Sequence, residues 1–527
     1  MSHFEVRTVP ATLTRAAERW PNQRFLVDNR TTLTYEETIR KVREFAAGLR
    51  ALGVQAGDRV LVMMDNHCDF PITWFAINYI GGTIVTANTA YKGDSLQNVI
   101  ENSEAMTVIA EGKYLERLSA AAPEWKPARV IVREVENADT GFEAGIVAFE
   151  EVPQQIPADF SPIVKAGDPA AIIFTSGTTG RSKGVIVPHG LLISFADPEH
   201  VAEAREGDVV PVMYPIYYIG GIEVVLNVAL VGATAVIFPR FSATTFWKAA
   251  KECGATYVGI NGTMMNFLNR QPPSEHDRSH SVRRLRIAPV LNDIDAIKKR
   301  FNIDQVSTCY GMTEASIPVV APFGRAQPGA LGWARDDFDV RIFDSEDREL
   351  PDGEIGEIVV RPKKPYSMML GYTKQPDVAA MWRNLWLHTG DLGRRTPDGE
   401  FFYVDRVKDS IRRRGENVSS QEVESYIYRH DAVLECAVVA VPDEVTSGDE
   451  IKAYLTLKPG KTFDFREFIK FLAEKMPSFW VPRYVEIVDE MPKSDKGSIV
   501  KRGLRSLPQG DRFWDREEEG IVLKRHQ

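Results

Sequence analysis

The sequence predicts an α/β protein with helix-covered, mostly parallel sheets, a small β-barrel and a smaller α+β domain at the C-terminal end. Helix and strand signals alternate through the N-terminal part. After about residue 330 the pattern changes to short strands joined by turns, and beyond it the strand–helix pattern returns on a smaller scale. At 527 residues the chain is too long for one hydrophobic core, so we expect at least two domains.

The first well-defined element is a helix that begins after Thr34. Thr34-Tyr35-Glu36-Glu37 is a capping box, apolar residues then recur at helical spacing, and Gly53 ends the helix. The apolar run 59–64 follows and predicts a buried strand. Helix–strand pairs recur at 72–86 and near 225–238. This βαβα order indicates parallel sheets covered by helices.

The sequence pattern after residue 330 indicates β-hairpins. Strand-like segments are joined by Pro-Asp-Gly-Glu turns at 351–354 and 397–400, which predicts an antiparallel sheet or small barrel. The strand-like segments are 339–344, 357–361 and 401–405. We place the domain boundary near Asp405, so that residues 1–404 and 405–527 form two domains. In the polar tail, Phe513 and Trp514 are candidates to hold the chain end against the body.

Composition excludes several classes of function. A net charge of −9 argues against a nucleic-acid surface. Four widely spaced cysteines without a CxxC pair give neither a zinc site nor a disulfide framework, and suit a reducing cytoplasm. The N-terminus has no apolar core of a secretory signal, and the apolar stretch 72–87 is too short for an integral membrane segment. We therefore expect a cytoplasmic protein.

The segment 171-AIIFTSGTTGRSKGV-185 joins an apolar strand to a loop of hydroxyls and glycines that ends in a lysine. Small residues let backbone N–H groups approach phosphate oxygens, while hydroxyls donate and Lys183 adds charge. The spacing differs from that of the Walker loop. A flexible surface loop is the alternative interpretation.

Two further segments carry nucleotide-binding chemistry. In 309-CYGMTEAS-316 the aromatic ring can stack on a base, Thr313 can donate to phosphate and Glu314 can bind Mg²⁺. Asp391 and Arg406 can bond the ribose hydroxyls of a nucleotide. The alternatives are an ordinary turn with an exposed glutamate and a hairpin with a solvated ion pair.

In this order the three segments resemble the adenylate-forming superfamily: acyl- and aryl-CoA ligases, luciferases and peptide-synthetase adenylation domains. The resemblance runs from about Leu13 to Leu504. It implies a large N-terminal domain with two sheets that binds ATP and the acid, and a mobile C-terminal domain. The implied enzyme is an AMP-forming acid–thiol ligase. A carboxylate and MgATP give acyl-AMP and pyrophosphate, and coenzyme A then gives acyl-CoA and AMP.

The resemblance also implies roles for individual residues. Tyr310 would lie against adenine, Thr313 would contact the α-phosphate, Glu314 would bind Mg²⁺ and Lys408 would be the hinge. The implied ATP- and AMP-binding residues are Thr175, Ser176, Gly177, Thr178, Thr179, Gly180, Lys183, Tyr310, Gly311, Met312, Asp391 and Arg406. The implied coenzyme A-facing residues are Arg412, Arg414, Gly415 and Glu416; for the arginines, a basic solvated patch is the alternative.

The family's last motif ends in a catalytic lysine, and Ser498 occupies that position in 491-MPKSDKGSIVK-501. Losing such a donor typically costs ~10²–10³-fold in rate. Three interpretations stay open: adenylation is weakened, Lys496 substitutes because residues two apart share a face of a strand, or the serine is engineered. A catalytically silent binder of nucleotide or acyl-AMP is the non-enzyme alternative.

The acid is the least defined part of the prediction. Tyr218, Gly220, Gly221 and Asn261 would line its pocket. Tyrosines and methionines nearby suggest a broad apolar pocket, although such residues are more often core. The segment 285–291 is shorter than the usual Gly-Gly-Ala-Pro version. The chain looks most similar to the carnitine/crotonobetaine-CoA ligase-like branch, whose members act on varied acids. The implied partners are the acid, ATP and coenzyme A. Homodimers are common in the family, but the sequence does not define the oligomeric state.

Overall fold

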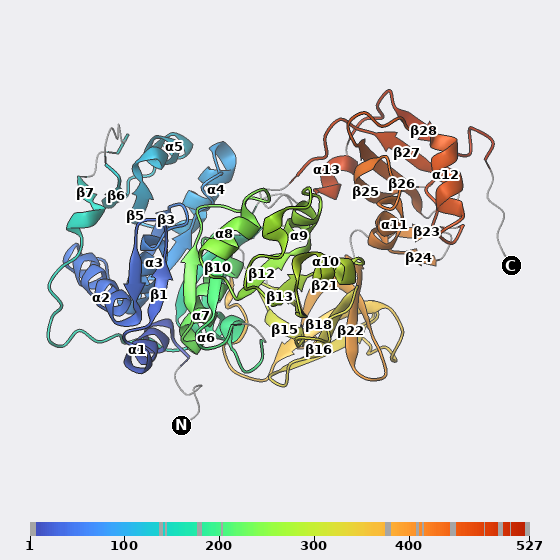
Figure 1. The fold of residues 1–527 in the computed structure, drawn as a ribbon. Coiled ribbons are helices and arrows are strands. Elements are labelled where there is room, and N and C mark those ends of the chain that lie inside the picture. Colours follow the sequence, from blue (N-terminus) through green and yellow to red (C-terminus); the bar gives the residue numbers. More distant parts are fainter. Residues whose placement is uncertain are drawn as a thin grey trace. The chain divides into compact units, whose positions relative to one another are not determined.

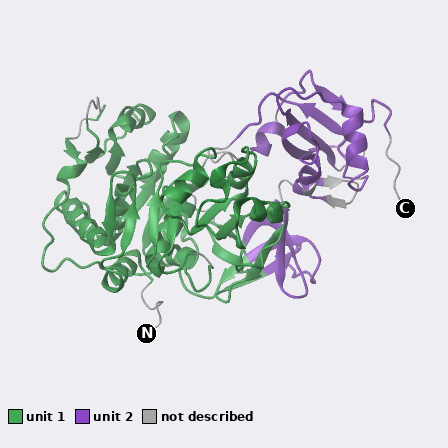
Figure 2. Cartoon of the chain, viewed as in Figure 1, with its two compact units in different colours: residues 1–340, 360–387 green, residues 341–359, 388–527 purple. Residues whose placement is uncertain are grey.

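The structure is a computed structural model, and its residues fall into two compact units (Figure 2). The first contains Met1–Val340 and Val360–Leu387, and the second contains Arg341–Val359 and His388–Gln527. The predicted boundary between residues 404 and 405 stays a prediction. The structure describes residues 7–135, 141–142, 145–175, 182–201, 204–374, 381–406, 411–413, 416–442, 449–478, 480–493, 499–505 and 507–521, without the side chains of 412, 413, 416, 417 and 422.

The first unit contains an eight-stranded sheet in the order β19-β9-β8-β4-β3-β5-β6-β7. Its strands from β8 to β7 are parallel to one another. Strand β9 pairs antiparallel with β8, and β19 pairs antiparallel with β9. The strands are β3 (Arg59–Met63), β4 (Thr83–Thr86), β5 (Thr107–Glu111), β6 (Arg129–Arg133), β7 (Ile146–Ala148), β8 (Pro169–Thr175), β9 (Lys183–Pro188) and β19 (Gly371–Tyr372). The predicted parallel, helix-covered sheet is confirmed.

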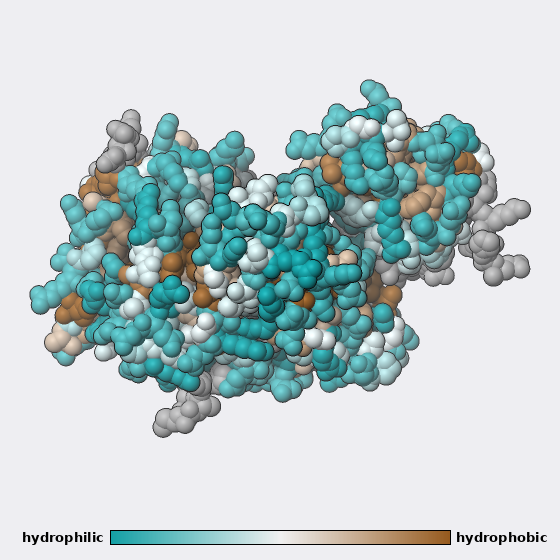
Figure 3. Space-filling model, in the orientation of Figure 1, coloured by the Kyte–Doolittle hydropathy of each residue, from teal (hydrophilic) through white to brown (hydrophobic). Residues whose placement is uncertain are grey.

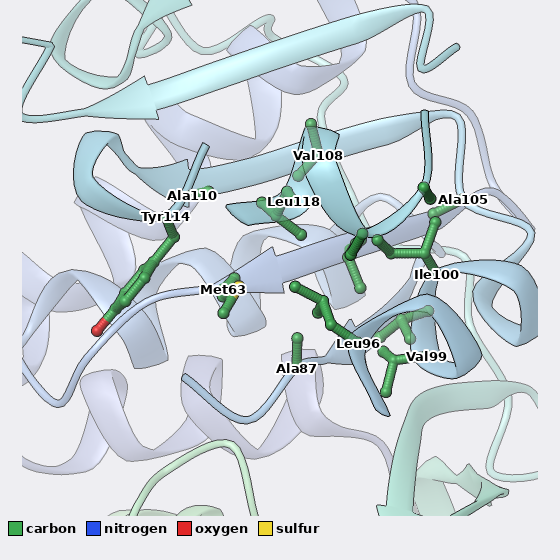
Figure 4. Packing of buried hydrophobic residues seen from close by; sticks show 14 of the residues in the cluster. Met63, Ala87, Leu96, Val99, Ile100, Ala105, Val108, Ala110, Tyr114 and Leu118 are labelled. Carbon is green, nitrogen blue, oxygen red and sulfur yellow. The ribbon is translucent and has the colours of Figure 1, made fainter. Parts of the chain in front are cut away.

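Helices cover this sheet because their apolar stripes face its strands. Helices α4 (Gly93–Ser103) and α5 (Leu115–Ala121) contribute Leu96, Ile100 and Leu118 to a buried cluster with Met63 and Val108 of the strands (Figure 4). Helices α2 (Tyr35–Ala51) and α3 (Asp69–Tyr79) pack on each other. The predicted capping box is present, since Thr34 Oγ1 accepts from the Glu37 amide and the Glu37 carboxylate accepts from the Thr34 amide.

A second sheet of this unit has the order β10-β11-β1-β2. Its strands β10, β11 and β1 are parallel, and β2 is antiparallel. They are β1 (Arg24–Val27), β2 (Thr32–Thr34), β10 (Val209–Val212) and β11 (Thr234–Ile237). The helices α1 (Val9–Arg19), α6 (His189–Ala196) and α7 (Ile219–Val231) pack against one another nearby.

The third group of strands carries the features that matter most for the site. Strands β12 (Tyr257–Asn261), β13 (Arg284–Ala288) and β14 (Gln305–Met312) are parallel, and β15 (Ser316–Ala321) and β16 (Ala330–Ala334) follow antiparallel. Helices α8 (Phe246–Glu252), α9 (Gly262–Asn269) and α10 (Ile294–Phe301) lie in the same region as β12 and β13 (Figure 1). Their apolar residues form a cluster with one face of β12–β14.

The predicted small barrel is the part of the fold that is wrong. The strands β17 (Phe338–Phe343), β18 (Gly356–Pro362), β21 (Trp386–Arg395) and β22 (Glu400–Arg406) run in the open order β17-β18-β21-β22, and β20 (Trp382–Arg383) pairs with β21. The hairpin β21–β22 turns where predicted, at Gly399 with φ +85°. Among the described strands this sheet does not close. The prediction failed because turns in the sequence define only neighbouring pairs of strands and do not specify whether the sheet closes.

The rest of the second unit has the predicted α+β character. A four-stranded sheet runs β25-β26-β27-β28 beside the hairpin β23–β24. The elements are β23 (Ile411–Arg413), β24 (Glu416–Val418), α11 (Ser420–Ile427), β25 (Val433–Pro442), β26 (Asp449–Leu457), α12 (Phe465–Ala473), β27 (Tyr484–Ile487), α13 (Lys501–Arg505) and β28 (Phe513–Asp515). Phe513 and Trp514 stack on Tyr484 and Phe465, so the tail aromatics hold the chain end as anticipated.

Short 3-10 helices at Gly112–Tyr114, Phe149–Glu151 and Glu275–Asp277 complete the described elements. The face drawn in Figure 3 is mainly hydrophilic, with hydrophobic residues in small scattered areas. Within the described residues, no helix has both the length and the apolar character that a membrane crossing requires.

Candidate active site

The predicted phosphate loop leaves the carboxyl end of β8 and returns along β9. Thr175 and Lys183 are paired across these antiparallel strands, so the ends of the loop are fixed by the sheet. Asn98 Nδ2 donates to the Ser182 carbonyl (2.9 Å), and the Tyr91 and Ser182 hydroxyls lie 3.4 Å apart. Helix α4 therefore supports the base of the loop. The predicted residues Ser176, Gly177, Thr178, Thr179 and Gly180 lie outside the described residues.

Tyr372 connects this loop with the second predicted motif. The Lys183 ammonium lies 5.1 Å from the centre of the Tyr372 ring, and the Tyr372 hydroxyl donates to Glu314 Oε1 (2.9 Å). A cation over an aromatic face is attracted by the ring's negative charge density. Lys183 and Glu314, which are far apart in sequence, are thus joined through one tyrosine that sequence reasoning did not single out.

Backbone pairing holds Tyr372 in this position. Strand β19 pairs antiparallel with β9, with Tyr372 opposite Val185. The Thr373 amide donates to the Gly184 carbonyl (2.8 Å), and the Met369 amide donates to the Glu314 carbonyl (2.9 Å). The segment around β19 is therefore fixed both to the strand after the loop and to the turn that carries Glu314.

The environment keeps the Tyr372 hydroxyl protonated. Tyr372 and Glu314 are both buried. Burial, followed by the neighbouring charge of Glu314, raises the pKa of Tyr372 well above its usual value. A protonated hydroxyl can donate to the carboxylate, which is itself a hard oxygen ligand of the kind that Mg²⁺ prefers. The donor chemistry of Glu314 therefore fits the predicted metal role.

The end of β14 requires its glycine, Gly311, because β15 passes close to it. A Cβ on Gly311 would lie 2.4 Å from the Ser316 carbonyl oxygen, so a larger residue would displace the turn. The pairing of Tyr310 and Met312 with β15 shifts register at this point. Tyr310 and Thr313 are both buried, at 9% and 8% exposure. The structure thus holds Tyr310, Gly311 and Met312 at the end of β14, and Thr313 and Glu314 in the turn that follows.

Asp391 and Arg406 come together in the second unit. They are directly opposite in the β21–β22 hairpin, and Arg406 Nε lies 3.3 Å from Asp391 Oδ1. The Thr389 hydroxyl accepts from the Asp391 amide (3.1 Å). The Gly390 amide donates to Glu357 Oε1 (2.9 Å) at a φ of +75°. Thr389 and Gly390 lie inside strand β21, and these two bonds fix the backbone at Gly390 and Asp391.

The loop that carries the last motif has both ends anchored. Lys493 pairs with Ile499 in an antiparallel bridge, and the Val500 amide donates to the Pro492 carbonyl (2.7 Å). Lys501 binds Glu424 of α11 (2.8 Å between Nζ and Oε1). Burial raises the pKa of Glu424, although Lys501 acts in the opposite direction. Lys496 and Ser498 lie between these anchors, outside the described residues.

The predicted hinge and coenzyme A-facing residues are mostly outside the described part of the chain. Lys408, Arg414 and Gly415 are not described, and Arg412 and Glu416 are described by backbone only, in β23 and β24. The segment before the hinge is well held, because the Ser420 amide donates to Asp405 Oδ2 (2.6 Å).

The predicted acid-pocket residues occupy two helix starts. Tyr218 is the N-terminal cap position of α7, and its hydroxyl accepts from Asn88 Nδ2 (2.9 Å). A Cβ on Gly221 would lie 2.3 Å from the Pro215 carbonyl oxygen, whereas Gly220 has open space. Asn261 caps α9 by accepting from the Met264 amide (2.7 Å). Asn261 therefore has a structural role, and its place in the acid pocket stays a prediction.

A buried ion pair near these residues escaped the sequence analysis. Arg286 of β13 makes two bonds to the carboxylate of Glu223 of α7, each 3.0 Å. Both residues are buried, Glu223 at 2% exposure. A glutamate inside the apolar helix 219–231 and an arginine inside the strand 284–288 are the signals that could have revealed the pair.

Comparison with known proteins defines the class. Residues 13–373 match the family described as AMP-binding enzyme, and residues 422–498 match the AMP-binding enzyme C-terminal domain. Since the first match covers more than half of the chain, the chain belongs to the AMP-binding enzyme family. Crotonobetaine/carnitine–CoA ligases from Shigella flexneri and Escherichia coli O157:H7 are 30% identical to it over 484 residues, or 90% of this chain and 93% of theirs.

Solved structures agree with this assignment. MatB from Rhodopseudomonas palustris with bound ATP has a TM-score of 0.81 at 25% identity, and the match covers 94% of this chain and 98% of that one. An anthranilate CoA ligase in complex with anthranoyl-AMP has a TM-score of 0.84 at 23% identity, and the match covers 95% and 96%. The first likeness extends to sequence, and the second shows the fold. Within its family the chain is an acid–thiol ligase, an acyl-CoA synthetase of the AMP-forming type.

Proposed function

We propose that this chain joins a carboxylic acid to coenzyme A in two steps on the residues described above. The acid carboxylate attacks the α-phosphate of MgATP, forms acyl-AMP and releases pyrophosphate. The coenzyme A thiol then attacks the acyl carbon and releases AMP. The observation that carries this proposal is the Lys183–Tyr372–Glu314 contact chain, because it brings together a cation and a carboxylate from the two segments that are predicted to bind the nucleotide.

Each residue has a distinct part in the first step. Lys183 and the loop from Thr175 hold the phosphates by charge and by backbone and hydroxyl donors. Thr313 donates to the α-phosphate, and Tyr310 lies against adenine. Bound Mg²⁺, held by Glu314, would neutralise phosphate charge. Because the acid supplies its own nucleophile, the protein's task is to orient two anions and stabilise the developing charge.

The second unit supplies the remaining roles in this proposal. Asp391 accepts from the ribose hydroxyls, and Arg406 donates to the same nucleotide. The domain turns about Lys408, after which Arg412, Arg414, Gly415 and Glu416 face coenzyme A. A cytoplasmic location stays a prediction, and the oligomeric state, with a homodimer as one option, stays open.

Tyr372→Phe tests the contact chain by removing only the hydroxyl that donates to Glu314. We expect pyrophosphate release to fall ~10-fold or more, because a carboxylate that loses its buried donor is no longer held in one orientation. Tyr366→Phe is the matched control, since Tyr366 is 52% exposed and should tolerate the same change. Equal rates for Tyr372→Phe and the unmodified chain would contradict the contact chain's role.

Ser498→Lys tests the predicted weakness in adenylation. We expect pyrophosphate release to rise ~10²-fold across a panel of acids, because a positive donor returns to the developing charge. Lys496→Ala in the unmodified chain is the companion variant. If it abolishes turnover while Ser498→Lys has little effect, Lys496 supplies the charge. If neither the unmodified chain nor Ser498→Lys releases pyrophosphate with any acid, the silent-binder alternative replaces the proposal.

A further inference from the structure

Helix α4 has two sides with different partners. Its apolar side, with Leu96, Val99 and Ile100, is buried in the cluster beside strands β3 and β5 (Figure 4). Its polar side carries Asn98 and Asn102, which are four residues apart and therefore neighbours on the helix surface. Because the apolar side is packed against the sheet, the polar side has a fixed position relative to the strands.

Asn102 fixes the orientation of the Asn98 side-chain amide. Asn102 Nδ2 donates to Asn98 Oδ1 (3.2 Å) and to the Asn98 carbonyl (2.7 Å). With its side-chain oxygen engaged as an acceptor, Asn98 presents Nδ2, which donates to the Ser182 carbonyl (2.9 Å). Asn98 is only 9% exposed, so water competes little for this bond.

The bond from Asn98 sets the direction of the peptide group between Ser182 and Lys183. In a planar trans peptide the carbonyl and the following N–H point in opposite directions. A Ser182 carbonyl that is held by Asn98 therefore turns the Lys183 N–H away from α4. The same bond keeps a partially negative oxygen on the helix, so that it does not turn toward the phosphates and repel them. The Tyr91 and Ser182 hydroxyls, 3.4 Å apart, add a second contact at this residue.

The same helix also holds the segment after Tyr372. Lys374 Nζ donates to the Glu101 carbonyl (2.5 Å) and lies 3.8 Å from Glu104 Oε1. Tyr372 is two residues before Lys374, and its ring contacts the Lys183 ammonium at 5.1 Å. Helix α4 is therefore bonded next to both members of the Lys183–Tyr372 contact, and it helps to fix their separation.

We propose that Asn98 is a positioning residue for ATP: held by Asn102, it fixes the peptide before Lys183, so that the phosphate loop meets the nucleotide with its donors already oriented. Lys374 supports the same arrangement from the side of Tyr372. This inference rests on the proposed function, because it assumes that the loop before Lys183 binds the phosphates. Orienting donors before the ligand arrives strengthens binding, so the loss of Asn98 weakens the binding of ATP.

Asn98→Ala and Asn98→Leu test the bond with and without a change in packing. Alanine removes the donor and most of the side chain, whereas leucine removes the donor and fills a similar volume. We would measure pyrophosphate release against ATP concentration, in the unmodified chain or in the Ser498→Lys background. We expect the KM for ATP to rise ~10-fold in both variants, with kcat and the KM for the acid changed by less than about 3-fold. A normal KM in Asn98→Leu would mean that Asn98 acts by packing alone, and would overturn the inference.

Asn78→Ala is the matched control for the loss of a buried asparagine. Asn78 is fully buried, and its Nδ2 donates to the carbonyls of Gly82 and Ala170, the latter at the amino end of β8. This variant should lower the melting temperature and leave the KM for ATP unchanged. Gln97→Ala, on the exposed side of α4, should change neither. An equal rise of the KM in Asn98→Ala and Asn78→Ala would assign the effect to lost stability and overturn the inference.

Lys374→Met tests the second contact of α4. Methionine keeps most of the side-chain stem and removes the charged donor. Because the Lys374 side chain is 49% exposed, water partly replaces its bonds, and we expect the KM for ATP to rise only about 2- to 3-fold. An unchanged KM in this variant would overturn the part of Lys374.

Trypsin gives a readout that does not depend on catalysis. Arg181 lies inside the phosphate loop, one residue before Ser182, and trypsin cleaves after arginine. At a temperature well below all melting temperatures, we expect cleavage after Arg181 to be ~10-fold faster in Asn98→Ala than in the unmodified chain, because cleavage follows the population of opened loop. Asn78→Ala should be cleaved at the unmodified rate. An unchanged rate in Asn98→Ala would overturn the inference.

The inference and the proposed function can fail separately. If no acid releases pyrophosphate, the proposed function fails, and titration calorimetry with MgATP decides the inference. A Kd that is ~10-fold weaker in Asn98→Ala than in the unmodified chain would support it, and equal Kd values would overturn it. If the unmodified chain does not bind ATP, both fail together.

Discussion

The two faces of β12–β14 differ in composition but hardly in exposure. Ile287 on one face is 0% exposed, and Arg286, its neighbour on the other face, is only 9% exposed. Alternation of polar and apolar residues usually indicates a strand with one face in water. Here the polar side is buried as well, so its residues depend on protein partners or on a ligand. Alternation of polar and apolar residues in the sequence therefore identifies the two faces of a strand, whereas the tertiary structure determines which faces are buried.

The largest expected effect comes from removing one charge of the Glu223–Arg286 pair on the polar face. Glu223→Ala leaves the Arg286 charge buried without its partner, which should lower the free energy of unfolding by ~3–5 kcal/mol. Urea denaturation measures this change. The double variant Glu223→Leu with Arg286→Met is the control, because replacing both members with apolar residues should be neutral or stabilising. A loss below about 1 kcal/mol in Glu223→Ala would mean that water reaches the arginine.

A substitution on the apolar face should lower the free energy of unfolding by nearly as much, but through a cavity and not through an unpaired charge. Ile287→Ala leaves a cavity in the cluster under α9 and α10, and should lower the free energy of unfolding by about 3 kcal/mol. The rate of pyrophosphate release by the folded enzyme should not change. Urea denaturation and the acid panel together check this prediction. A lower rate in Ile287→Ala would show that the apolar face also supports the reaction.

His189, a buried histidine outside the sheet, allows a third buried polar group to be compared through the pH dependence of stability. His189 is fully buried, and its Nδ1 accepts from the Val9 amide (3.3 Å). Burial lowers the pKa of His189 to about 4, although Asp168 acts in the opposite direction. The unfolded chain binds this proton near its usual pKa of about 6.5, so stability is complete above that pH and is lost as the pH falls toward 4. We expect the free energy of unfolding to fall by at most about 3 kcal/mol between pH 6.5 and pH 4, and by less in His189→Gln. Urea denaturation at several pH values in this range measures the change.

The smallest effect concerns two buried tyrosine hydroxyls. Tyr35→Phe removes a hydroxyl with two acceptors and should lower the free energy of unfolding by about 1 kcal/mol. Tyr257→Phe removes one without a partner among the described residues, and should change it by less than about 0.5 kcal/mol or stabilise the protein. Thermal unfolding of both variants measures the difference. A larger loss in Tyr257→Phe would point to a bonded structural water.

The sequence predicted those features that depend on neighbours in the chain. The capping box of Thr34 and Glu37, the strand before the loop at Thr175, and the hairpin turn at Gly399 follow from local backbone preferences. The barrel was wrong because closure depends on pairing between distant strands, for which hairpin turns carry no signal.

The site was predicted unevenly for a related reason. Asp391 and Arg406 meet through one hairpin, so their pairing follows from the turn between them. Tyr372 reaches Glu314 from a segment far along the chain, and no spacing rule connects the two. Glu223 and Arg286 looked like isolated charges because their pairing depends on how α7 lies against β13.

The anchored ends of the final loop have a practical meaning for protein engineering. Lys493 and Ile499 pair with each other, and Lys501 is bound to α11, so the five positions between the paired residues form an exchangeable cassette. Randomising that cassette while keeping both anchors gives a compact library in which each position can carry the lysine. Selection for growth on a chosen acid would then show which placement the enzyme accepts, and whether different acids favour different placements.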